Sequence, residues 1–381
     1  MTAALASIEI TGFRSIAALR LELSSAVTLL IGANGVGKSN VVDALELLGY
    51  TVDQGLQAYT LRSGGFSQLA HRSPKYGVAE AISVKAWGDW NPSIKGTFRN
   101  GYRMTLSAGP DDAALLNETT LTHRTDYPTP YEHSLGLSRE SQLHDYISEH
   151  VANRYLFDVL SGCRVFHFDD TSHDAPPLRW ADTADRESLH SDARNLAAVL
   201  LDISENNPKT YLQILRSIRN VAPFFDDFVL RPDGGRVILR WKERGLDDVF
   251  SGSALSSGTL RFICLAVLLQ QPRQPATIVL DEPELGLHPA AIHQLADLFR
   301  NRADGQRIVA ATQSVTLLSQ FGIDEVAVVE RRGGDTTVSR PDRETLEAWL
   351  MDYSLGELWE MNLLGGRPGP SHPSFTEGAD S

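Results

Sequence analysis

One stretch of the sequence decides the fold: Gly32-Ala33-Asn34-Gly35-Val36-Gly37-Lys38-Ser39. It matches the pattern G-x-x-x-x-G-K-S, which is typical of a phosphate-binding loop. The apolar run 26–31 before it suits a buried parallel strand, and residues 39–48 after it predict a helix with one apolar face. A strand, a glycine-rich loop and a helix thus follow one another in the order that phosphate binding requires.

The loop predicts a nucleotide site with a role for each kind of residue. Glycines let the backbone approach phosphate closely, and free N–H groups at the helix N-terminus point at the anion. Lys38 can reach the β- and γ-phosphates, and Ser39 can bind Mg²⁺. The alternative is a chance glycine loop before a helix. We expect the nucleotide-binding residues of this segment to be Gly32, Ala33, Asn34, Gly35, Val36, Gly37, Lys38, Ser39 and Asn40.

A pair of carboxylates follows a second apolar strand. Residues 278–280 are Ile, Val and Leu, and Asp281 and Glu282 come directly after them. Asp281 stands where an acid can hold Mg²⁺, directly or through water. Glu282 is placed to orient or deprotonate an attacking water, as a general base does. Two solvated acids at a strand end are the alternative interpretation.

Two further segments suit contacts with a terminal phosphate. The first is Leu255-Ser256-Ser257-Gly258-Thr259, which precedes an apolar helix predicted over 260–269 and resembles the L-S-G-G-Q signature of ABC-type ATPases. Its serine hydroxyl and free N–H groups suit an anion, although a plain helix cap explains them equally. The second is Gln313, after the apolar strand 308–312, where ABC-type ATPases usually place a histidine. A glutamine can hydrogen-bond to phosphate or water but carries no charge.

In this order, the four elements resemble the ATPase core of the RecF/SMC-like, ABC-type group. Residues 8–16 resemble its opening strand and turn, and residues 281–289 its acidic strand and the loop after it. Residues 165–172, 353–359 and 364–366 resemble parts of a family of compact bacterial predicted ATPases. The resemblance implies an α/β fold of the P-loop NTPase class. It would be an ABC-type ATPase head with a mixed sheet and a compact α+β insertion instead of a coiled coil.

The resemblance also implies an activity, which is ATP binding and hydrolysis with Mg²⁺ by a homodimer that ATP joins. Ser256 and Gly258 of one subunit would close over the nucleotide held by the other. Gln68 would reach Mg²⁺ and the attacking water, and Arg14 would lie near the nucleotide. A surface glutamine and a surface arginine are the plainer interpretations. We therefore assign Glu282 and Gln313 to catalysis, and Ser39, Asp281 and Gln68 to the metal.

The chain divides into four predicted segments. Residues 1–90 form the N-terminal part of the ATPase core, residues 91–250 an inserted α+β lobe, residues 251–366 the C-terminal part of the core, and residues 367–381 a disordered tail rich in Pro, Gly and Ser. No sustained heptad pattern is present, so no long coiled coil is expected. Within the insertion, turn residues predict hairpins at Asn100-Gly101 and at Asp233-Gly234-Gly235.

The charge of the chain bounds its partners. The net charge is −13 over 381 residues, which opposes general attraction to nucleic acid but leaves room for a local basic groove. One candidate lies after the second hairpin, where alternation puts basic side chains opposite Val237, Leu239 and Trp241. Ordinary solvated strand faces are the alternative. The candidate basic residues are Arg236, Arg240 and Lys242 on the face shared with Ile238, and Lys95, Arg99 and Arg103 near the first hairpin.

Cysteine usage and hydropathy indicate a cytoplasmic protein. Cys163 and Cys264 are the two cysteines, and neither belongs to a C-x-x-C pair. No signal peptide is apparent, and the longest apolar run, 262–269, is far short of the roughly 20 residues that span a membrane. The histidines and aspartates within 167–174 lack regular ligand spacing, so packing is favoured over a metal site.

The task of the ATPase is less defined by the sequence than its chemistry. Family analogy favours a nucleic-acid-associated ATPase in DNA repair or anti-phage defence, with DNA as a possible partner. The alternative is an ATP-gated regulatory subunit that controls a separate effector protein, such as a nuclease. A transporter's nucleotide-binding subunit is the weaker third interpretation, because the region 91–250 is long for that class.

Overall fold

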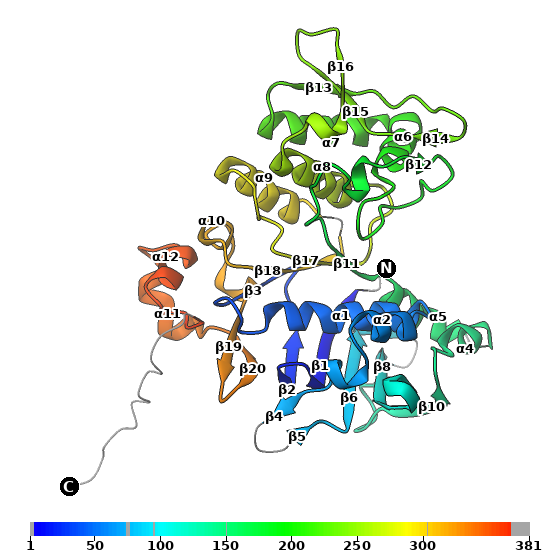
Figure 1. The fold of residues 1–381 in the computed structure, drawn as a ribbon. Coiled ribbons are helices and arrows are strands. Elements are labelled where there is room, and N and C mark those ends of the chain that lie inside the picture. Colours follow the sequence, from blue (N-terminus) through cyan, green and yellow to red (C-terminus); the bar gives the residue numbers. More distant parts are fainter. Residues whose placement is uncertain (1–3, 74–76, 94–95, 150, 303, 367–381) are drawn as a thin grey trace.

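A six-stranded mixed sheet forms the centre of the computed structural model, which describes residues 4–73, 77–93, 96–149, 151–302 and 304–366 (Figure 1). Its strand order is β11-β17-β18-β3-β19-β20, and five neighbouring strands are parallel while β20 is antiparallel to β19. The strands are β11 (Cys163–Phe166), β17 (Thr277–Asp281), β18 (Arg307–Thr312), β3 (Val27–Ile31), β19 (Val326–Arg332) and β20 (Asp335–Ser339).

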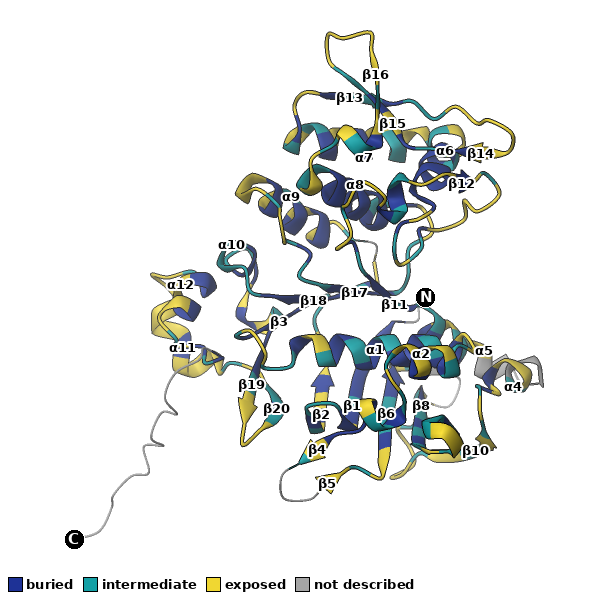
Figure 2. Cartoon of the chain, in the orientation of Figure 1, coloured by how far each residue is buried: buried dark blue, intermediate teal, exposed yellow. Residues whose placement is uncertain are grey.

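Both faces of this sheet are buried, which explains its short and continuously apolar strands (Figure 2). Successive side chains of a strand point to opposite faces. Accordingly, Val27, Leu29 and Ile31 of β3 belong to one hydrophobic core, and Leu30 belongs to the other. In β17, Ile278 likewise lies in the first core. The sheet is therefore the wall between two cores.

The second core lies between the central sheet and an antiparallel sheet, with α1 (Lys38–Val52) packed in the middle. The antiparallel order is β10-β9-β8-β6-β1-β2, and β7 pairs with β8. The strands are β1 (Leu5–Phe13), β2 (Ile16–Glu22), β6 (Ala81–Gly88), β7 (Asn91–Ser93), β8 (Gly96–Ala108), β9 (Ala114–Arg124) and β10 (Tyr131–Ser138). The other elements of this layer are α2 (Leu56–Arg62), α3 (Phe66–Leu69), α4 (Leu143–Glu149), α5 (Val151–Ser161) and the short strands β4 (Arg72–Ser73) and β5 (Gly77–Val78).

The first core is covered by a helical lobe on the opposite face of the central sheet (Figure 1). Its central helix is α8 (Ser257–Gln270), in which residues 260–269 are all buried, as the apolar run predicts. Around it lie α6 (Leu196–Asn206), α7 (Pro208–Val221), α9 (Pro289–Arg300), and the strands β12 (Ala181–Asp182), β13 (Phe225–Phe228), β14 (Arg236–Val237), β15 (Arg240–Glu243) and β16 (Val249–Ser251).

The C-terminal part of the described chain packs at the end of the sheet formed by β19 and β20 (Figure 1). It consists of α10 (Val315–Leu318), α11 (Arg343–Leu350) and α12 (Leu355–Glu360). Single turns of 3₁₀ helix occur at Pro110–Asp112, Pro176–Leu178, Gly252–Ala254 and Ile323–Glu325. None of the helices that the structure describes is long and apolar enough to cross a membrane.

The predicted α/β P-loop fold with a mixed sheet is confirmed, but one predicted hairpin is wrong. Asn100 and Gly101 lie inside the continuous strand β8, paired with Thr122 and Leu121 of β9. The glycine is needed for packing, because a Cβ at Gly101 would lie 2.5 Å from the indole ring of Trp87. The tight turn at residues 233–236 is present, with two backbone hydrogen bonds between Asp233 and Arg236.

The residues predicted as one inserted lobe are distributed over three places. Strands β8, β9 and β10 extend the antiparallel sheet that also contains β1, whereas β11 is the edge strand of the central sheet. Helices α6 and α7 pack in the helical lobe. The predicted basic residue Lys95 and the predicted tail 367–381 lie outside the described residues.

Candidate nucleotide-binding site

The strand order brings the predicted site residues to one edge of the central sheet. Strand β18 pairs with β17 on one side and with β3 on the other, all parallel. Asp281 is aligned with Ala311, and Thr312 is aligned with Ile31. The residues that follow these three strands therefore emerge side by side. Ligands of open α/β sheets bind outside this carboxyl edge.

The loop after β3 wraps around the first turn of α1. Gly37 has φ of +105°, a conformation that favours glycine, and it precedes Lys38 at the start of the helix. The Lys38 ammonium donates hydrogen bonds to the carbonyl oxygens of Gly32 and Ala33, with N···O distances of 2.9 and 3.0 Å. The cation is thus held over the mouth of the loop, where a phosphate would lie.

Burial lowers the pKa of the Lys38 ammonium, and the carboxylates of Glu282, Asp281 and Glu284 oppose that shift. The side chain is 5% exposed. A cation with little solvent around it interacts strongly with an anion that enters the site, because charges are screened less in such a place. This environment suits a triphosphate.

Asp281 and Ser39 have the environment that a hard divalent cation needs. Burial raises the pKa of the Asp281 carboxyl, while a hydrogen bond from the Ser39 side chain opposes the rise. The Oδ1 atom of Asp281 is buried and has no hydrogen-bond partner among the described residues. A buried carboxylate oxygen without a partner is costly unless a cation or water satisfies it. The pair therefore fits Mg²⁺, which prefers oxygen ligands and retains water.

Glu282 and Gln313 contact each other directly. The Gln313 amide donates from Nε2 to Oε1 of Glu282 across 2.5 Å. Glu282 has φ of +44°, which is unusual outside glycine, and its backbone N–H donates to the Ala311 carbonyl over 2.8 Å. The backbone bond and the side-chain bond fix the carboxylate at the edge of the sheet, where a general base would stand.

Glu284 is a carboxylate of this site that the sequence analysis did not single out. Its Oε1 accepts hydrogen bonds from the Thr312 hydroxyl at 2.5 Å and from the Gln313 backbone N–H at 3.2 Å. Burial raises the pKa of this carboxyl. Its position two residues after Glu282 was the available signal. It ties the turn after β17 to the end of β18.

A second layer of contacts orients the loop and the first turns of α1. The Thr336 hydroxyl donates to the Val36 carbonyl at 2.7 Å and lies 2.6 Å from the Ser15 hydroxyl. The Asn40 amide donates to the same Ser15 hydroxyl over 2.5 Å. The predicted nucleotide residue Asn40 is thus engaged in supporting the loop. Thr336 comes from β20, 300 residues away from Val36 along the chain.

Arg14 and Gln68 lie next to each other but differ in their partners. Arg14 forms an ion pair with Asp43 on α1, and its backbone N–H donates to the Leu69 carbonyl at 2.7 Å. Gln68 therefore stands on the short helix beside Arg14, with an exposed side chain. Within the described residues, no hydrogen bond joins the Gln68 side chain to Ser39 or Asp281. Its assignment to the metal stays a prediction.

The segment 255–259 lies in the helical lobe, on the other face of the sheet from α1 (Figure 1). The Ser256 hydroxyl caps α8 by accepting from the Thr259 N–H at 3.2 Å, and Ser256 is exposed. Gly258 is required by close packing, because a Cβ there would collide with the carbonyl oxygen of Gly286. The cap predicted as the alternative is present, and its exposure leaves the turn accessible to a second molecule.

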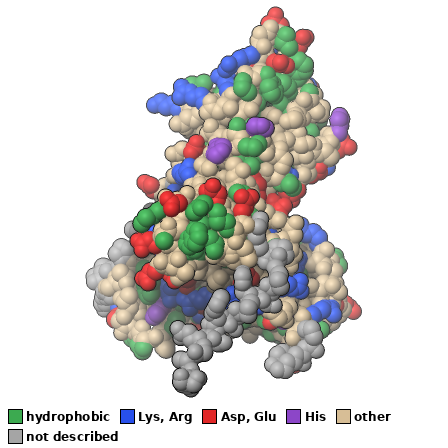
Figure 3. Space-filling view, turned by 90° about the vertical axis from the view of Figure 1, so that its left-hand side faces the viewer, with side chains coloured by type: hydrophobic (Ala, Val, Ile, Leu, Met, Phe, Trp, Pro, Cys, Tyr) green, Lys and Arg blue, Asp and Glu red, His purple; other side chains and the backbone are tan. Residues whose placement is uncertain are grey.

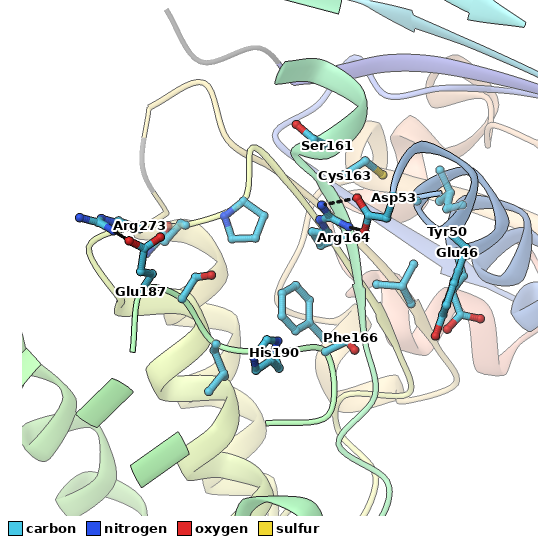
Figure 4. A pocket seen from close by; sticks show the side chains of 18 of the residues that line it. Glu46, Tyr50, Asp53, Ser161, Cys163, Arg164, Phe166, Glu187, His190 and Arg273 are labelled. Carbon is cyan, nitrogen blue, oxygen red and sulfur yellow. Dashed lines mark hydrogen bonds and ion pairs between the residues drawn. The ribbon is translucent and has the colours of Figure 1, made fainter. Parts of the chain in front are cut away.

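A cavity of about 680 Å³ lies away from the loop, along the second half of α1 and the edge strand β11 (Figure 4). Ion pairs cross its walls, between Arg164 and Asp53 with Nη2···Oδ1 at 3.0 Å, and between Arg273 and Glu187 at 3.3 Å. No group of three or more potential metal ligands occurs among the described residues. Within the segment 167–174, His167 is hydrogen-bonded to Glu46, whereas the side chains of His173 and Asp174 are exposed.

The fold and the site together define a P-loop ATPase of the ABC type. The chain belongs to the family described as "AAA domain, putative AbiEii toxin, Type IV TA system", whose model matches residues 118–319. A second model, described as "AAA ATPase domain", matches residues 4–56, which include the glycine loop. The expected resemblance to the RecF/SMC-like ABC-type ATPases is confirmed, and the family models identify an ATPase domain of the AAA class in the chain.

Solved structures with the same fold include heads of SMC proteins. The chain is similar to an SMC head bound to the C-winged helix domain of ScpA, with a TM-score of 0.60, 18% identity, and coverage of 91% of this chain and 99% of that one. An SMC head from Pyrococcus furiosus, with an extended coiled coil and the C-terminal domain of ScpA, gives a TM-score of 0.57, 16% identity, and coverage of 92% and 99%.

A curated relative carries the ATPase likeness at the level of sequence. It is the energy-coupling factor transporter ATP-binding protein EcfA2 of Lacticaseibacillus paracasei, 33% identical over 106 residues. The match covers 27% of this chain and 35% of that relative. The chain thus spans about a third of the relative's length.

Proposed function

We propose that this protein is an ATP-driven dimer, in which each nucleotide is held by the loop of one subunit and capped by the 255–259 turn of the other. The observation that carries the proposal is the separation of two complementary half-sites. Lys38, Asp281 and Glu282 gather at the edge of the sheet, whereas Ser256 is exposed at the N-terminus of α8 in the other lobe. An exposed helix N-terminus favours an anion.

In the proposed mechanism, Lys38 neutralises the β- and γ-phosphates and Ser39 and Asp281 hold Mg²⁺. The metal, when bound, supplies neutralisation of the charge that develops on the phosphates. Glu282 accepts the proton of the attacking water, and Gln313 holds the Glu282 carboxylate in position. Release of phosphate removes the anion that joins the two subunits, so the dimer opens. ATP thus shifts the population from open subunits to the closed dimer, because it binds the closed state more tightly than the open one.

The test of the dimer is the molar mass of a hydrolysis-deficient variant. Glu282→Gln preserves the shape and the hydrogen bond to Gln313 but cannot accept a proton. In saturating Mg-ATP we expect light scattering to report a dimer for E282Q and a monomer for the double variant K38A/E282Q, which cannot bind the nucleotide. An E282Q protein that remains monomeric under these conditions would contradict the proposal.

We further propose that the ATPase acts in anti-phage defence or DNA repair, in the cytoplasm. The description of the family as a putative AbiEii toxin of a type IV toxin–antitoxin system supports a defence role. DNA contact has one local basis, since Arg236 and Arg240 are exposed while Val237, Leu239 and Trp241 on the opposite face are buried. The two cysteines are buried and unpaired, in keeping with a reducing compartment.

DNA-dependent stimulation of ATP hydrolysis tests this role. We expect double-stranded or single-stranded DNA to raise the rate, and R236E/R240E to abolish the stimulation without changing the basal rate. The double variant R20E/R273E, at exposed positions on β2 and in the loop after α8, changes the net charge equally and serves as the matched control. Indifference of the wild-type rate to every DNA form tested would count against a nucleic-acid role.

The second candidate function is an ATP-gated subunit that regulates a separate effector protein. It is favoured by exposed apolar side chains such as Trp349 and Met351 between α11 and Leu363, which an isolated ATPase would not need. Co-purification with the products of neighbouring genes, with and without ATP, separates this function from the first. A nuclease retained by the wild type and released by K38A would favour the effector role.

A further inference from the structure

The segment from α11 to Leu363 carries a concentration of exposed hydrophobic side chains. Met351 is 79% exposed, and the rings of Trp349 and Tyr353 lie with their centroids 5.9 Å apart. Figure 3 shows hydrophobic side chains gathered on this side of the molecule at the level of α11 and α12. Contiguous apolar surface of this kind marks an interaction site. We call it the C-terminal patch, formed by Trp349, Met351, Tyr353, Met361 and Leu363.

Acidic side chains accompany the patch, and the one basic residue of the segment from α11 to Leu363, Arg343, is paired with Asp324. Figure 3 shows acids around the apolar cluster, and between Glu344 and Gly366 the sequence contains no Lys or Arg. The exposed acids of this segment are Glu344, Glu347, Asp352, Glu357 and Glu360.

This charge selects the kind of partner. An acidic rim repels nucleic acid and anionic lipid surfaces. A second copy that met the patch through a two-fold axis would place like charges opposite one another, which is unfavourable at an interface. A basic protein segment with an apolar face satisfies both the charge and the hydrophobic surface. An amphipathic helix that lays its apolar side on such a surface is a recurring mode of recognition.

The buried side of the same segment leads to the nucleotide site. Leu355, Leu358 and Trp359 of α12 belong to the first core, and the Ser354 hydroxyl lies 3.3 Å from that of Ser319, at the end of α10. Helix α10 begins at the second residue after Gln313. The patch is therefore joined by packed helices to the end of β18, which Gln313 follows directly.

A second connection reaches the glycine loop itself. The Ala33 N–H donates to the Gly366 carbonyl over 2.7 Å, and the Gly366 N–H donates to Oε1 of Glu330 at 2.9 Å. Gly366 follows the patch residue Leu363 by three positions. A displacement of α12 would therefore alter the hydrogen bonding of a backbone N–H in the phosphate-binding loop.

We propose that the C-terminal patch is the docking site for a basic, amphipathic helix of a partner protein, and that docking and nucleotide binding are coupled through α12. The docking part is independent of the proposed function, whereas the coupling rests on the loop being the nucleotide site. Coupling between two binding sites is reciprocal. If the partner changes the affinity of the protein for ATP by some factor, ATP must change the affinity for the partner by the same factor.

A defined probe tests the docking. It is a fluorescein-labelled helical peptide with leucines on one face and lysines flanking them, compared by anisotropy with a scrambled peptide of the same composition. We expect W349E and M351E each to weaken binding of the ordered peptide at least about tenfold. The matched control is L61E on α2, where the leucine is 82% exposed on the opposite side of the molecule. The affinity of L61E for the ordered peptide should stay within about twofold of the wild-type value.

The role of the acids is tested by charge reversal. E344K/E347K should weaken binding of the ordered peptide more than the control D247K/D248K does. The control changes the net charge equally, at exposed positions in the helical lobe. Equal losses would mean that the peptide senses net charge alone, and this result would overturn the proposal. The proposal would also be overturned if the wild type bound the scrambled peptide as tightly as the ordered one, or if L61E lost binding of the ordered peptide. Self-association that W349E and M351E abolish would assign the patch to a second copy instead.

The coupling is measured as the affinity of the ordered peptide with and without Mg-ATP. We expect a change of at least about threefold in wild type, which K38A eliminates while the peptide still binds. Binding that is unaffected by ATP, in a protein that binds ATP, would refute the coupling and leave the docking site intact. Failure of E282Q to dimerise while the peptide binds would instead reject the proposed dimer, so the two hypotheses fail separately.

Discussion

The side-chain amide of Gln313 hydrogen-bonds to the carboxylate of Glu282, with 2.5 Å between Nε2 and Oε1. The two residues come from neighbouring parallel strands, β18 and β17. An imidazole at position 313 would donate a comparable bond and could also become charged, whereas an amide cannot. The contact therefore orients the carboxylate without making the orientation depend on pH. This relationship leads to the first prediction.

Gln313→Ala should lower kcat for ATP hydrolysis by about 10- to 100-fold and leave the affinity for ATP within about twofold, because the carboxylate loses its orientation but the loop is untouched. Phosphate release and fluorescent-nucleotide binding measure the two quantities. Gln320→Ala, a glutamine at the end of α10 and away from Glu282, is the control. An unchanged kcat in Q313A would show that the contact has no role in the reaction.

Ser256 allows its capping role to be separated from a role at the phosphate. Ser256→Asp retains an acceptor for the Thr259 N–H, and aspartate is as good a helix cap as serine, so the melting temperature should not fall. A negative charge would nevertheless repel a γ-phosphate. In the E282Q background we expect S256D to prevent the ATP-dependent dimer seen by light scattering. S256A should instead cost about 1 kcal/mol of stability. A dimer that forms normally in S256D would remove Ser256 from the proposed interface.

Thr312→Val should destabilise the fold by about 1–3 kcal/mol, because the buried Glu284 carboxyl loses the hydroxyl that donates to it. Urea unfolding followed by circular dichroism measures the difference. Thr316→Val, at a partly buried position on α10, is the control and should change stability by less than about 1 kcal/mol. If T312V is as stable as wild type, Glu284 is satisfied by other groups.

The pair formed by His167 and Glu46 predicts a dependence of stability on pH. His167 Nε2 donates a hydrogen bond to Oε1 of Glu46 at 3.2 Å, and this bond raises the pKa of His167 above its usual value of 6.5, although burial opposes the rise. A raised pKa in the folded state means that the contribution is fully present below 6.5 and is lost as pH rises through the folded value. We expect H167Q to lower the melting temperature more at pH 6 than at pH 9. His173→Gln, on an exposed loop, should show no such difference. An equal effect of H167Q at both pH values would mean that the ion pair adds no stability.

The elements predicted from local pattern correspond closely to the structure. The strand before the loop is β3, the helix after it is α1, and the apolar run behind the 255–259 turn is α8. Each prediction used residues within one or two turns, where backbone preference and hydrophobic periodicity act. Asn100-Gly101 was mispredicted by the same local reasoning. A long-range contact with Trp87 requires the glycine there, and no turn forms.

The sequence by itself determined the chemistry that the chain carries: a glycine loop with Lys38 and Ser39, two carboxylates after an apolar strand, and a polar residue after another. These are properties of short segments, so they can be recognised without knowing what lies beside them. The tertiary structure alone decided that the strand order β17-β18-β3 places them at one edge, that Thr336 and Gly366 support the loop, and that the C-terminal patch stays exposed. Such contacts join residues hundreds of positions apart, and their energy depends on how whole layers pack rather than on any local pattern.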